Sequence, residues 1–300
     1  MPGPRGRDLV LLVALTLLWG VNWPIMKISM AELSPLTFRS ATGVLGGLGL
    51  VLVARLTGER LTVPRDHWRP LVIAAVLNYS IWQVLGAYGI TFMASGIASV
   101  LAFTMPLWAV LFSALFLGDK ATPRRVIGLA LGLSGLAVLM SGDFARLGSS
   151  PIGVPLMIGA AISWAAGTVY VKSVSWRISV VTLTTWLVLI GQIPVLAVTL
   201  AVEGLHMPDA SFAAWAGLAY TVAFGFVFGY LAWFRIVRAF PAPVAAVSSL
   251  MIPCVGVISG AIMLGERPGW RGILALALVM AAIALVLEVR LPWRARERAA

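Results

Sequence analysis

The segment ASVLAFTMPLWAVLFSALFLGDK, residues 98–120, decides the fold because a related segment, AAVSSLMIPCVGVISGAIMLGER, occurs at residues 245–267. The two segments are offset by 147 residues, and both place a proline in an apolar run that ends in Leu-Gly, an acidic residue and a basic residue. Recurrence at a fixed offset indicates an internal duplication of the chain. The paired residues are Pro106 and Pro253, Gly118 and Gly265, Asp119 and Glu266, and Lys120 and Arg267.

A second set of recurring residues lies nearer the start of each half. These pairs, both offset by 145 residues, are Trp19 with Trp164 and Lys27 with Lys172. We therefore divide the chain into residues 1–145 and residues 146–300, and each part contains five apolar segments. An odd number of membrane spans turns the second half upside down relative to the first, which is a common design of secondary transporters.

The composition places the whole chain in a bilayer. Of the 300 residues, 60% are hydrophobic and 11% are charged, and the mean hydropathy is +0.98. A soluble domain carries about 25% charged residues, so these values exclude a soluble enzyme with a membrane anchor. The net charge of +11 is accordingly not a nucleic-acid signal. The single cysteine, Cys254, excludes an internal disulfide and a cysteine-based metal cluster.

Ten apolar segments lie between the charged residues. A helix needs about 20 apolar residues to cross the hydrocarbon core, and these segments lack the alternation of membrane β-strands. The first run continues past Trp19 and Trp23 to Met30, which predicts a span rather than a cleaved leader. We expect an all-α polytopic membrane protein with ten transmembrane helices at about residues 9–30, 34–54, 70–92, 94–117 and 126–141, and then 152–171, 178–202, 211–234, 241–264 and 272–287.

Basic residues are distributed unevenly between the two sets of connections. If the N-terminus is cytoplasmic, 17 of the 22 Lys and Arg residues fall on the cytoplasmic side. Cytoplasmic loops of membrane proteins carry such an excess. The pattern predicts that both termini are cytoplasmic and that the number of spans is even.

The repeat resembles that of a known family, the drug/metabolite transporter superfamily and specifically its EamA-type members, over about residues 9–290. Asp119 departs from the glutamate usual at that point, which Glu266 keeps. Among the members, the chain is most similar to bacterial aromatic amino acid exporters of the YddG type. The resemblance implies two inverted five-helix repeats and a location in the bacterial inner membrane. The residues that carry it are Trp19-Gly20-Val21-Asn22-Trp23, then Pro106 with Leu117-Gly118-Asp119, and Pro253 with Leu264-Gly265-Glu266.

Polar side chains in the third span predict a transport path. Tyr79 and Gln83 are four residues apart and share a helix face, with Asn78 beside them. An amide and a phenol at membrane depth need partners, either from neighbouring helices or from a ligand and water. At the offset of 147 their counterparts are Phe226 and Tyr230, so the matching face of the eighth span is aromatic. The alternative is that Asn78 and Gln83 only hold helices together.

Further candidate residues lie in the first, fourth and sixth spans. Asn22 follows Trp19 by one turn and precedes Pro24, whose ring removes a backbone hydrogen bond. Trp19 and Trp164 either line a cavity or pack between helices, and Trp108 faces either lipid or the cavity. We expect the cavity residues to be Tyr79, Gln83, Asn22, Trp19, Trp164, Asn78, Trp108 and Tyr230, and the helix bends to be at Pro24, Pro106 and Pro253.

Ionisable residues are missing from the middle of the expected spans. All 11 acidic residues lie in loops or near segment ends, and both histidines, His67 and His206, are in loops. Proton- and sodium-coupled carriers usually place an ionisable residue inside the membrane, so we expect transport without ion coupling. Basic residues also avoid mid-span, Arg39 lying about a turn and a half into its helix. A zwitterion with an aromatic or hydrophobic side chain therefore suits the path better than a phosphorylated substrate.

The expected function is secondary transport by alternating access, with export of aromatic and other hydrophobic or neutral amino acids or similar small metabolites. The alternatives are a proton-coupled drug or metabolite exporter of the same fold, and a channel or non-transporting membrane subunit. An enzyme is not expected, because the spans contain no nucleophile with a base, no paired aspartates and no histidine-rich metal site. We expect a small-molecule substrate and the lipid bilayer as partners, no nucleic acid, no metal and no cofactor, and a monomer or weak dimer.

Overall fold

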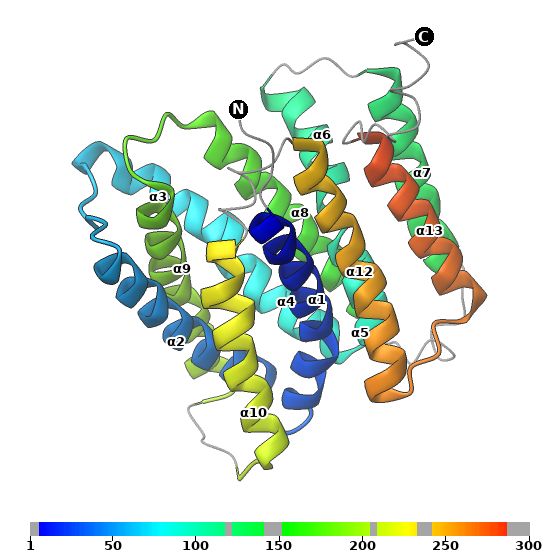
Figure 1. The fold of residues 1–300 in the computed structure, drawn as a ribbon, viewed down its shortest axis with the longest axis horizontal. Coiled ribbons are helices and arrows are strands. Elements are labelled where there is room, and N and C mark those ends of the chain that lie inside the picture. The colour runs from blue at the N-terminus through cyan, green and yellow to red at the C-terminus, as the bar shows by residue number, and fades with distance from the viewer. Residues whose placement is uncertain (1–5, 118–121, 141–151, 205–208, 233–241, 287–300) are drawn as a thin grey trace.

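The computed structural model describes residues 6–117, 122–140, 152–204, 209–232 and 242–286. Within these ranges the chain is helical and contains no strand (Figure 1). Seven described helices are long and apolar enough to cross a membrane. The structure confirms an all-helical polytopic architecture, and the count of ten spans stays a prediction. Shorter apolar helices lie in the fifth, ninth and tenth expected spans, at Val126–Gly135, Met251–Leu264 and Gly269–Leu285.

The helices begin and end close to the expected spans. In the first half they are α1 (Gly6–Ser29), α2 (Pro35–Leu56), the 3-10 helix η1 (Arg65–His67), α3 (Trp68–Ala75), η2 (Val76–Ser80), α4 (Ile81–Thr91), α5 (Ser95–Ala102), α6 (Met105–Phe116) and α7 (Pro123–Met140). In the second half they are α8 (Gly153–Ser173), α9 (Val180–Val202), α10 (Phe212–Tyr220), η3 (Thr221–Phe228), α12 (Ala242–Leu264) and α13 (Gly269–Val286). Asp119 and Lys120, which belong to the repeated ending, lie outside the described residues.

The third and eighth expected spans both contain a π-helical segment. In the third span η2 joins α3 to α4 without a break, and in the eighth η3 follows α10 directly. At the offset of 147 residues, η2 corresponds to residues 223–227, which lie inside η3. A π-helical turn shifts the register of the side chains along a helix and frequently occurs at functional sites. The same irregularity therefore lies at equivalent depth in the two halves.

The fourth expected span is interrupted at Phe103 and Thr104, between α5 and α6. Pro106 lies in the first turn of α6, so its missing N–H and its ring prevent α5 from continuing. The hydroxyl of Thr104 donates to the carbonyl of Leu101 at 2.6 Å and satisfies one of the carbonyls freed at the break. By contrast, α1 runs through Pro24 and α12 runs through Pro253 as single helices.

Helices from the two halves pack on each other in a reciprocal way. The first helix of the first half, α1, packs against α10, η3 and α12, which belong to the third and fourth spans of the second half. The first helix of the second half, α8, packs against η2, α4, α5 and α6, which belong to the third and fourth spans of the first half. The remaining spans pair with their counterparts, α2 with α9 and α7 with α13, the latter pair at the right-hand edge in Figure 1.

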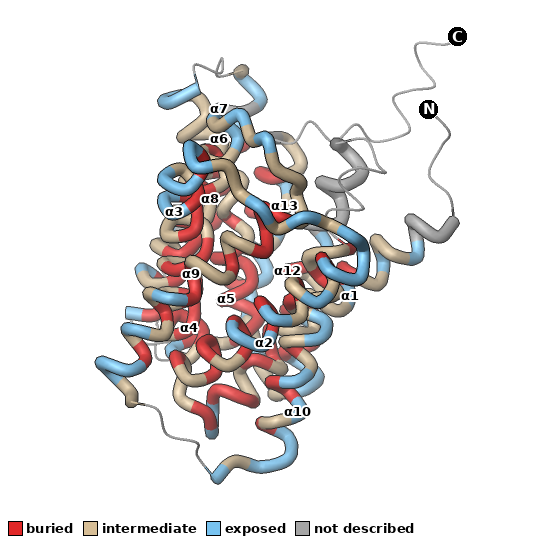
Figure 2. Tube along the Cα trace, turned by 90° about the vertical axis from the view of Figure 1, so that its left-hand side faces the viewer, coloured by how far each residue is buried: buried red, intermediate tan, exposed pale blue. Residues whose placement is uncertain are grey.

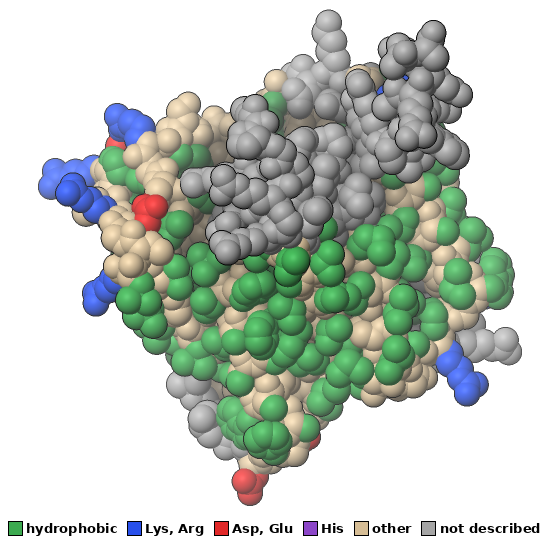
Figure 3. Space-filling model, in the orientation of Figure 1, with side chains coloured by type: hydrophobic (Ala, Val, Ile, Leu, Met, Phe, Trp, Pro, Cys, Tyr) green, Lys and Arg blue, Asp and Glu red, His purple; other side chains and the backbone are tan. Residues whose placement is uncertain are grey.

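The burial pattern is that of a bundle surrounded by apolar solvent. Figure 2 shows that the buried residues lie mainly inside the bundle. Phe38, Ile90 and Met157 have no exposed surface. Large apolar side chains face outward, among them Leu48 and Ile262, which are 57% and 79% exposed. In Figure 3 the described part of one face consists largely of hydrophobic side chains, with Lys, Arg and a few acidic side chains at its margins. Such a surface is stable in contact with lipid, where helices satisfy their own backbone groups.

Candidate functional site

A buried aromatic contact links the two π-helical segments. The ring of Tyr79 in η2 makes an edge-to-face contact with Phe226 in η3, with 6.3 Å between the ring centroids. The ring of Tyr230, one turn after Phe226, lies tilted by 48° against the Phe226 ring, with 5.9 Å between the centroids. Tyr79 and Phe226 are the repeat partners predicted from the offset of 147 residues. We call the group formed by Tyr79, Gln83, Gln192, Phe226 and Tyr230 the central cluster.

A buried hydrogen bond anchors Tyr79 in the central cluster. Its hydroxyl donates to Gln192 Oε1 in α9 at 2.9 Å, and Gln192 Nε2 donates to the carbonyl of Ser40 in α2 at 3.5 Å. Gly43 makes this possible, because a Cβ there would lie 2.6 Å from Gln192 Cδ. Gly191 likewise leaves room for the Tyr79 ring, because an added Cβ at this position would lie 2.8 Å from the ring. Three helices thus converge on one phenol.

Gln83 lies one turn after Tyr79 and close to its hydroxyl, and only 2% of its surface is exposed. Gln192 is 5% exposed, so both amides are buried between spanning helices. The sequence prediction placed Gln83 here and missed Gln192. The signal for Gln192 was the same, a lone amide in the middle of an apolar span. Burying an amide is costly unless it is hydrogen-bonded. Two buried amides in the same cluster as Tyr79 therefore mark a candidate polar site.

Asn78 and Trp164 meet on one side of the central cluster. Asn78 Nδ2 donates to the carbonyl of Trp164 and to Thr168 Oγ1, both at 3.2 Å. The Trp164 ring lies edge-to-face with Trp82 at 5.3 Å, and Gly167 lets α8 approach the backbone of Asn78. Asn78 therefore joins α8 to η2, as the helix-joining alternative expects.

Trp19 and Asn22 form a related junction on the other side. Trp19 Nε1 donates to the carbonyl of Gly225 in η3 at 3.2 Å, and Thr221 Oγ1 donates to Asn22 Oδ1 at 2.9 Å. Gly229 leaves room for the Trp19 ring. The junction of α1 with η3 and the junction of α8 with η2 are thus equivalent under the repeat, and both fix a tryptophan-bearing helix to a π-helical segment.

The remaining predicted residues lie apart from the central cluster. Trp108 Nε1 donates to Thr104 Oγ1 at 3.2 Å, and its ring packs on the large apolar core cluster. Pro24 and Pro253 are buried inside continuous helices, and Pro106 is at the interruption described above. Of the residues expected to line a cavity, the structure brings Tyr79, Gln83 and Tyr230 together and places Asn78, Trp164, Trp19 and Asn22 at the two flanking junctions.

Three carboxylates cap the N-termini of other helices at one end of the bundle. Glu203, at the end of α9, accepts hydrogen bonds from the backbone N–H groups of Leu36 and Thr37 at the start of α2, at 3.1 and 2.9 Å. Glu266 accepts from the N–H groups of Ser95 and Gly96 at the start of α5, at 2.6 and 3.0 Å. Carboxylates are favourable at helix N-termini because they satisfy the free N–H groups and oppose the helix dipole.

Two further contacts strengthen the same end. Lys27 in α1 lies 3.5 Å from Glu266 and also donates to the carbonyl of Met93. Glu32 accepts two hydrogen bonds of 2.6 Å from Ser211, which precedes α10. These bonds lower the pKa of the Glu32 carboxyl below its ordinary value of 4.5. At this end of the bundle Glu32, Glu203 and Glu266 therefore each link one helix to the start of another.

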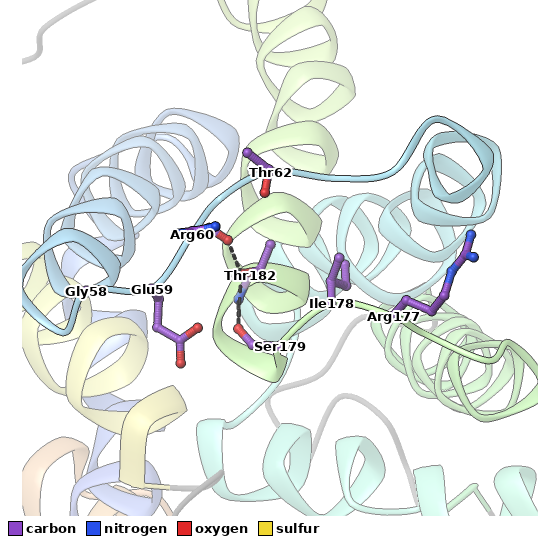
Figure 4. Close-up of a pocket in the computed structure, with 8 residues that line it drawn as sticks. All are labelled: Gly58, Glu59, Arg60, Thr62, Arg177, Ile178, Ser179 and Thr182. Carbon is purple, nitrogen blue, oxygen red and sulfur yellow. Dashed lines mark hydrogen bonds between the residues drawn. The ribbon is translucent and has the colours of Figure 1, made fainter.

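A surface pocket of about 410 Å³ opens at the opposite end of the helices (Figure 4). Thr182 at the start of α9 donates to the carbonyl of Arg60 at 2.9 Å, and its N–H is capped by Ser179 Oγ at 3.2 Å. None of the residues expected to line a cavity belongs to it. Its lining residues are Gly58, Glu59, Arg60, Thr62, Arg177, Ile178, Ser179 and Thr182.

The fold and the central cluster define an integral membrane protein whose buried polar groups converge between spanning helices. The EamA-like transporter family model matches residues 7–141 and 151–288. The chain therefore belongs to the EamA-like transporter family, as the sequence resemblance predicted.

Relatives of known sequence extend over nearly the whole chain. The uncharacterized transporter YvbV of Bacillus subtilis is 32% identical and covers 94% of this chain and 92% of its own length. The uncharacterized inner membrane transporter YedA of Escherichia coli is 28% identical over 92% of this chain and 89% of its own. A probable amino-acid metabolite efflux pump of Escherichia coli is 25% identical over 92% of this chain and 93% of its own. A solved crystal structure with 17% identity superimposes with a TM-score of 0.67, covering 99% of this chain and 100% of its own.

Proposed function

We propose that this transporter exports aromatic and other hydrophobic or neutral amino acids across the bacterial inner membrane by alternating access and without ion coupling. Family membership establishes a transporter, and the proposal adds a substrate class and a mechanism. The observation that carries it is the central cluster, where uncharged amides and phenols meet aromatic rings between spanning helices. The similarity to a probable amino-acid metabolite efflux pump favours the same class.

The proposed architecture has ten spans in two inverted repeats, residues 1–145 and 146–300, with both termini in the cytoplasm. Three observations support it: the reciprocal packing of α1 and α8, the π-helical segments at equivalent positions, and the two separate matches to the family model. In transporters built this way, substrate binds near the midplane between the repeats. The central cluster, to which η2 and η3 both contribute, is therefore the proposed place of substrate binding.

The chemistry of the central cluster suits a zwitterion with an apolar side chain. The rings of Phe226 and Tyr230 offer a surface on which an aromatic side chain stacks, and the same rings attract an ammonium group. Gln83 and Gln192 each carry a donor and an acceptor for the polar groups of the substrate. Interactions of this kind hold a small metabolite without the several converging Lys and Arg side chains that phosphorylated substrates require.

The placement of the acidic residues supports transport without ion coupling. In the part of the chain that the structure describes, the acidic side chains are all at helix ends or in connections, and three of them are engaged as helix caps. A coupling carboxylate would have to lie deeper, where protonation can be linked to substrate binding. Alternating access would require the caps of Glu203 and Glu266 to separate as the opposite end closes.

The proposal is tested by uptake of labelled Phe, Trp, Thr and Met into liposomes that contain the purified protein, with and without an imposed pH gradient. Saturable uptake that stops at the external concentration, whatever the pH gradient, is expected. Accumulation above that concentration when the gradient is imposed would favour the proton-coupled alternative. Uptake that rises linearly with concentration, without saturation, would favour a channel. Empty liposomes and liposomes with heat-unfolded protein serve as controls.

A further inference from the structure

The strongest unexplained feature of the bundle is the side chain of Arg39 in α2. Arg39 is the fifth residue of this helix, so it lies about 6 Å along the axis from Pro35. Only 5% of its surface is exposed, although arginine is almost never buried without a partner. The sequence prediction treated Arg39 as a residue near a span end and gave it no role. The structure places it inside the bundle instead.

The Arg39 guanidinium lacks the partner that its burial requires. Its Nε has no hydrogen-bond partner among the described residues, and no described carboxylate lies within ion-pair distance. The carboxylate of Glu203 is one turn away but is already occupied. It accepts bonds from the N–H groups of Leu36 and Thr37, from the hydroxyls of Ser34 and Thr37, and from Tyr88.

A purely structural role does not account for this placement. An unpaired buried charge is strongly unfavourable, and a cation in the first turns of a helix also opposes the helix dipole. Arg271, the other described arginine with an unpaired Nε, is less buried, and its guanidinium lies over the ring of Trp270 at 5.0 Å. Arg39 is thus the buried cation whose charge the described part of the protein leaves unneutralised.

Arg39 also lies beside the central cluster. Gly43, one turn further along the same face of α2, contacts the Tyr79 hydroxyl and the Gln192 amide. Tyr79 and Tyr230 are both close enough to Arg39 to interact with its charge. A small molecule bound against these two phenols would therefore have the guanidinium within reach of one end.

We infer that Arg39 is the carboxylate-binding residue of the substrate site, so that the transported molecules are monocarboxylates or zwitterions rather than amines or neutral drugs. A planar guanidinium binds a carboxylate through two parallel hydrogen bonds. The carboxylate would supply both the partner and the charge that Arg39 lacks. This inference rests on the proposed function, because it assigns one part of the same site and narrows its substrate class.

The inference is tested with three compounds that share one aromatic ring: phenylalanine, phenylalanine amide, which lacks the carboxylate, and 3-phenylpropanoate, which lacks the ammonium group. Each is used to inhibit exchange of labelled phenylalanine by the purified protein in liposomes. In the wild type, the amide should inhibit at least tenfold more weakly than phenylalanine. In Arg39→Gln, inhibition by phenylalanine and 3-phenylpropanoate should weaken by about 10- to 100-fold while inhibition by the amide stays unchanged, because a hydrogen-bonded charge pair is lost.

Two further variants control for charge and for folding. Arg39→Lys keeps the charge and loses the paired donors, so it should retain part of the preference for carboxylates. Arg55→Gln removes an exposed arginine from the last turn of the same helix and should behave as the wild type. A folded Arg39→Gln that still prefers phenylalanine to its amide would overturn the inference. Failure of both Arg39 variants to fold would also overturn it, by making Arg39 a structural residue.

A separate binding measurement distinguishes failure of the inference from failure of the proposed function. Thermal unfolding of the detergent-solubilised protein is followed with and without 3-phenylpropanoate. Stabilisation of the wild type that is absent in Arg39→Gln would support the carboxylate site even if no amino acid were transported. Amino acid transport with equal inhibition by phenylalanine and its amide would leave the proposed function standing and refute the role of Arg39.

Discussion

Replacement of Gly43 by alanine should destabilise the protein by disrupting the hydrogen bond between Tyr79 and Gln192. An added Cβ would lie 2.6 Å from Gln192 Cδ, and closer still to Gln192 Oε1 and the Tyr79 hydroxyl. Carbon atoms in contact are normally about 3.5–4.0 Å apart, so the amide must move by about 1 Å. That movement breaks its bonds to Tyr79 and to the Ser40 carbonyl.

The expected magnitude follows from three contributions. Overpacking in a well-packed core costs about 1–3 kcal/mol, and the two lost hydrogen bonds cost about 0.6 kcal/mol each on average between membrane helices. The higher helix propensity of alanine offsets about 1 kcal/mol of this loss in the free energy of unfolding. Gly43→Ala should therefore lower the free energy of unfolding by about 1–3 kcal/mol. Gly86→Ala is the matched control, because its added Cβ would lie 4.0 Å from the nearest side chain, Ala160.

Thermal unfolding of the purified protein, followed by tryptophan fluorescence, measures this difference. Gly43→Ala should lower the midpoint by several degrees, and Gly86→Ala should leave it unchanged or raise it slightly. The loss should shrink when Gln192 is also replaced by alanine, since the clash with the Gln192 amide is then removed and only the contact with the Tyr79 hydroxyl remains. A Gly43→Ala protein as stable as Gly86→Ala, or an equal loss in the Gln192→Ala background, would refute the proposed geometry.

Three further outcomes are expected from the same unfolding assay. The stability that Glu32 contributes through its bonds to Ser211 should be complete above pH 4.5 and should be lost as the pH falls through the lowered pKa of Glu32. The unfolding midpoints of the wild type and Glu32→Gln should therefore converge in acid. Glu266→Gln should cost about 1 kcal/mol by weakening the cap of α5. Asn78→Ala should cost about 1–2 kcal/mol, and Asn78→Asp more, because Thr168 and the Trp164 carbonyl suit an amide donor.

The sequence predicted the positions of the helices better than their irregularities. Spans are set by long apolar runs, and α2 and α9 begin within about two residues of the expected starts. The π-helical turns in η2 and η3 leave no mark in hydropathy, because they change the backbone register without changing the apolar pattern. The interruption before α6 could be related to Pro106, whereas Pro24 and Pro253 lie in helices that continue.

The central cluster could be predicted only in part. Tyr79 and Gln83 share a helix face, so spacing alone placed them together. Gln192 comes from a helix more than a hundred residues away, and contacts between such distant segments cannot be read from periodicity. The burial of Arg39 could not be predicted from its position in the sequence. Its distance from the end of the span indicates its depth in the membrane, whereas its burial depends on which helices pack against α2. Depth alone predicts a charge near the membrane interface, and the packing of the helices makes Arg39 a buried charge.

The measurement that tests the account most directly is exchange of external labelled phenylalanine for internal unlabelled phenylalanine in liposomes, compared between the wild type and Gln83→Ala. The control is Val72→Ala, which alters an outward-facing residue of the same span. The account predicts rapid exchange by the wild type and Val72→Ala and at least tenfold slower exchange by Gln83→Ala at subsaturating substrate. Equal exchange by all three proteins would contradict a substrate site at the central cluster.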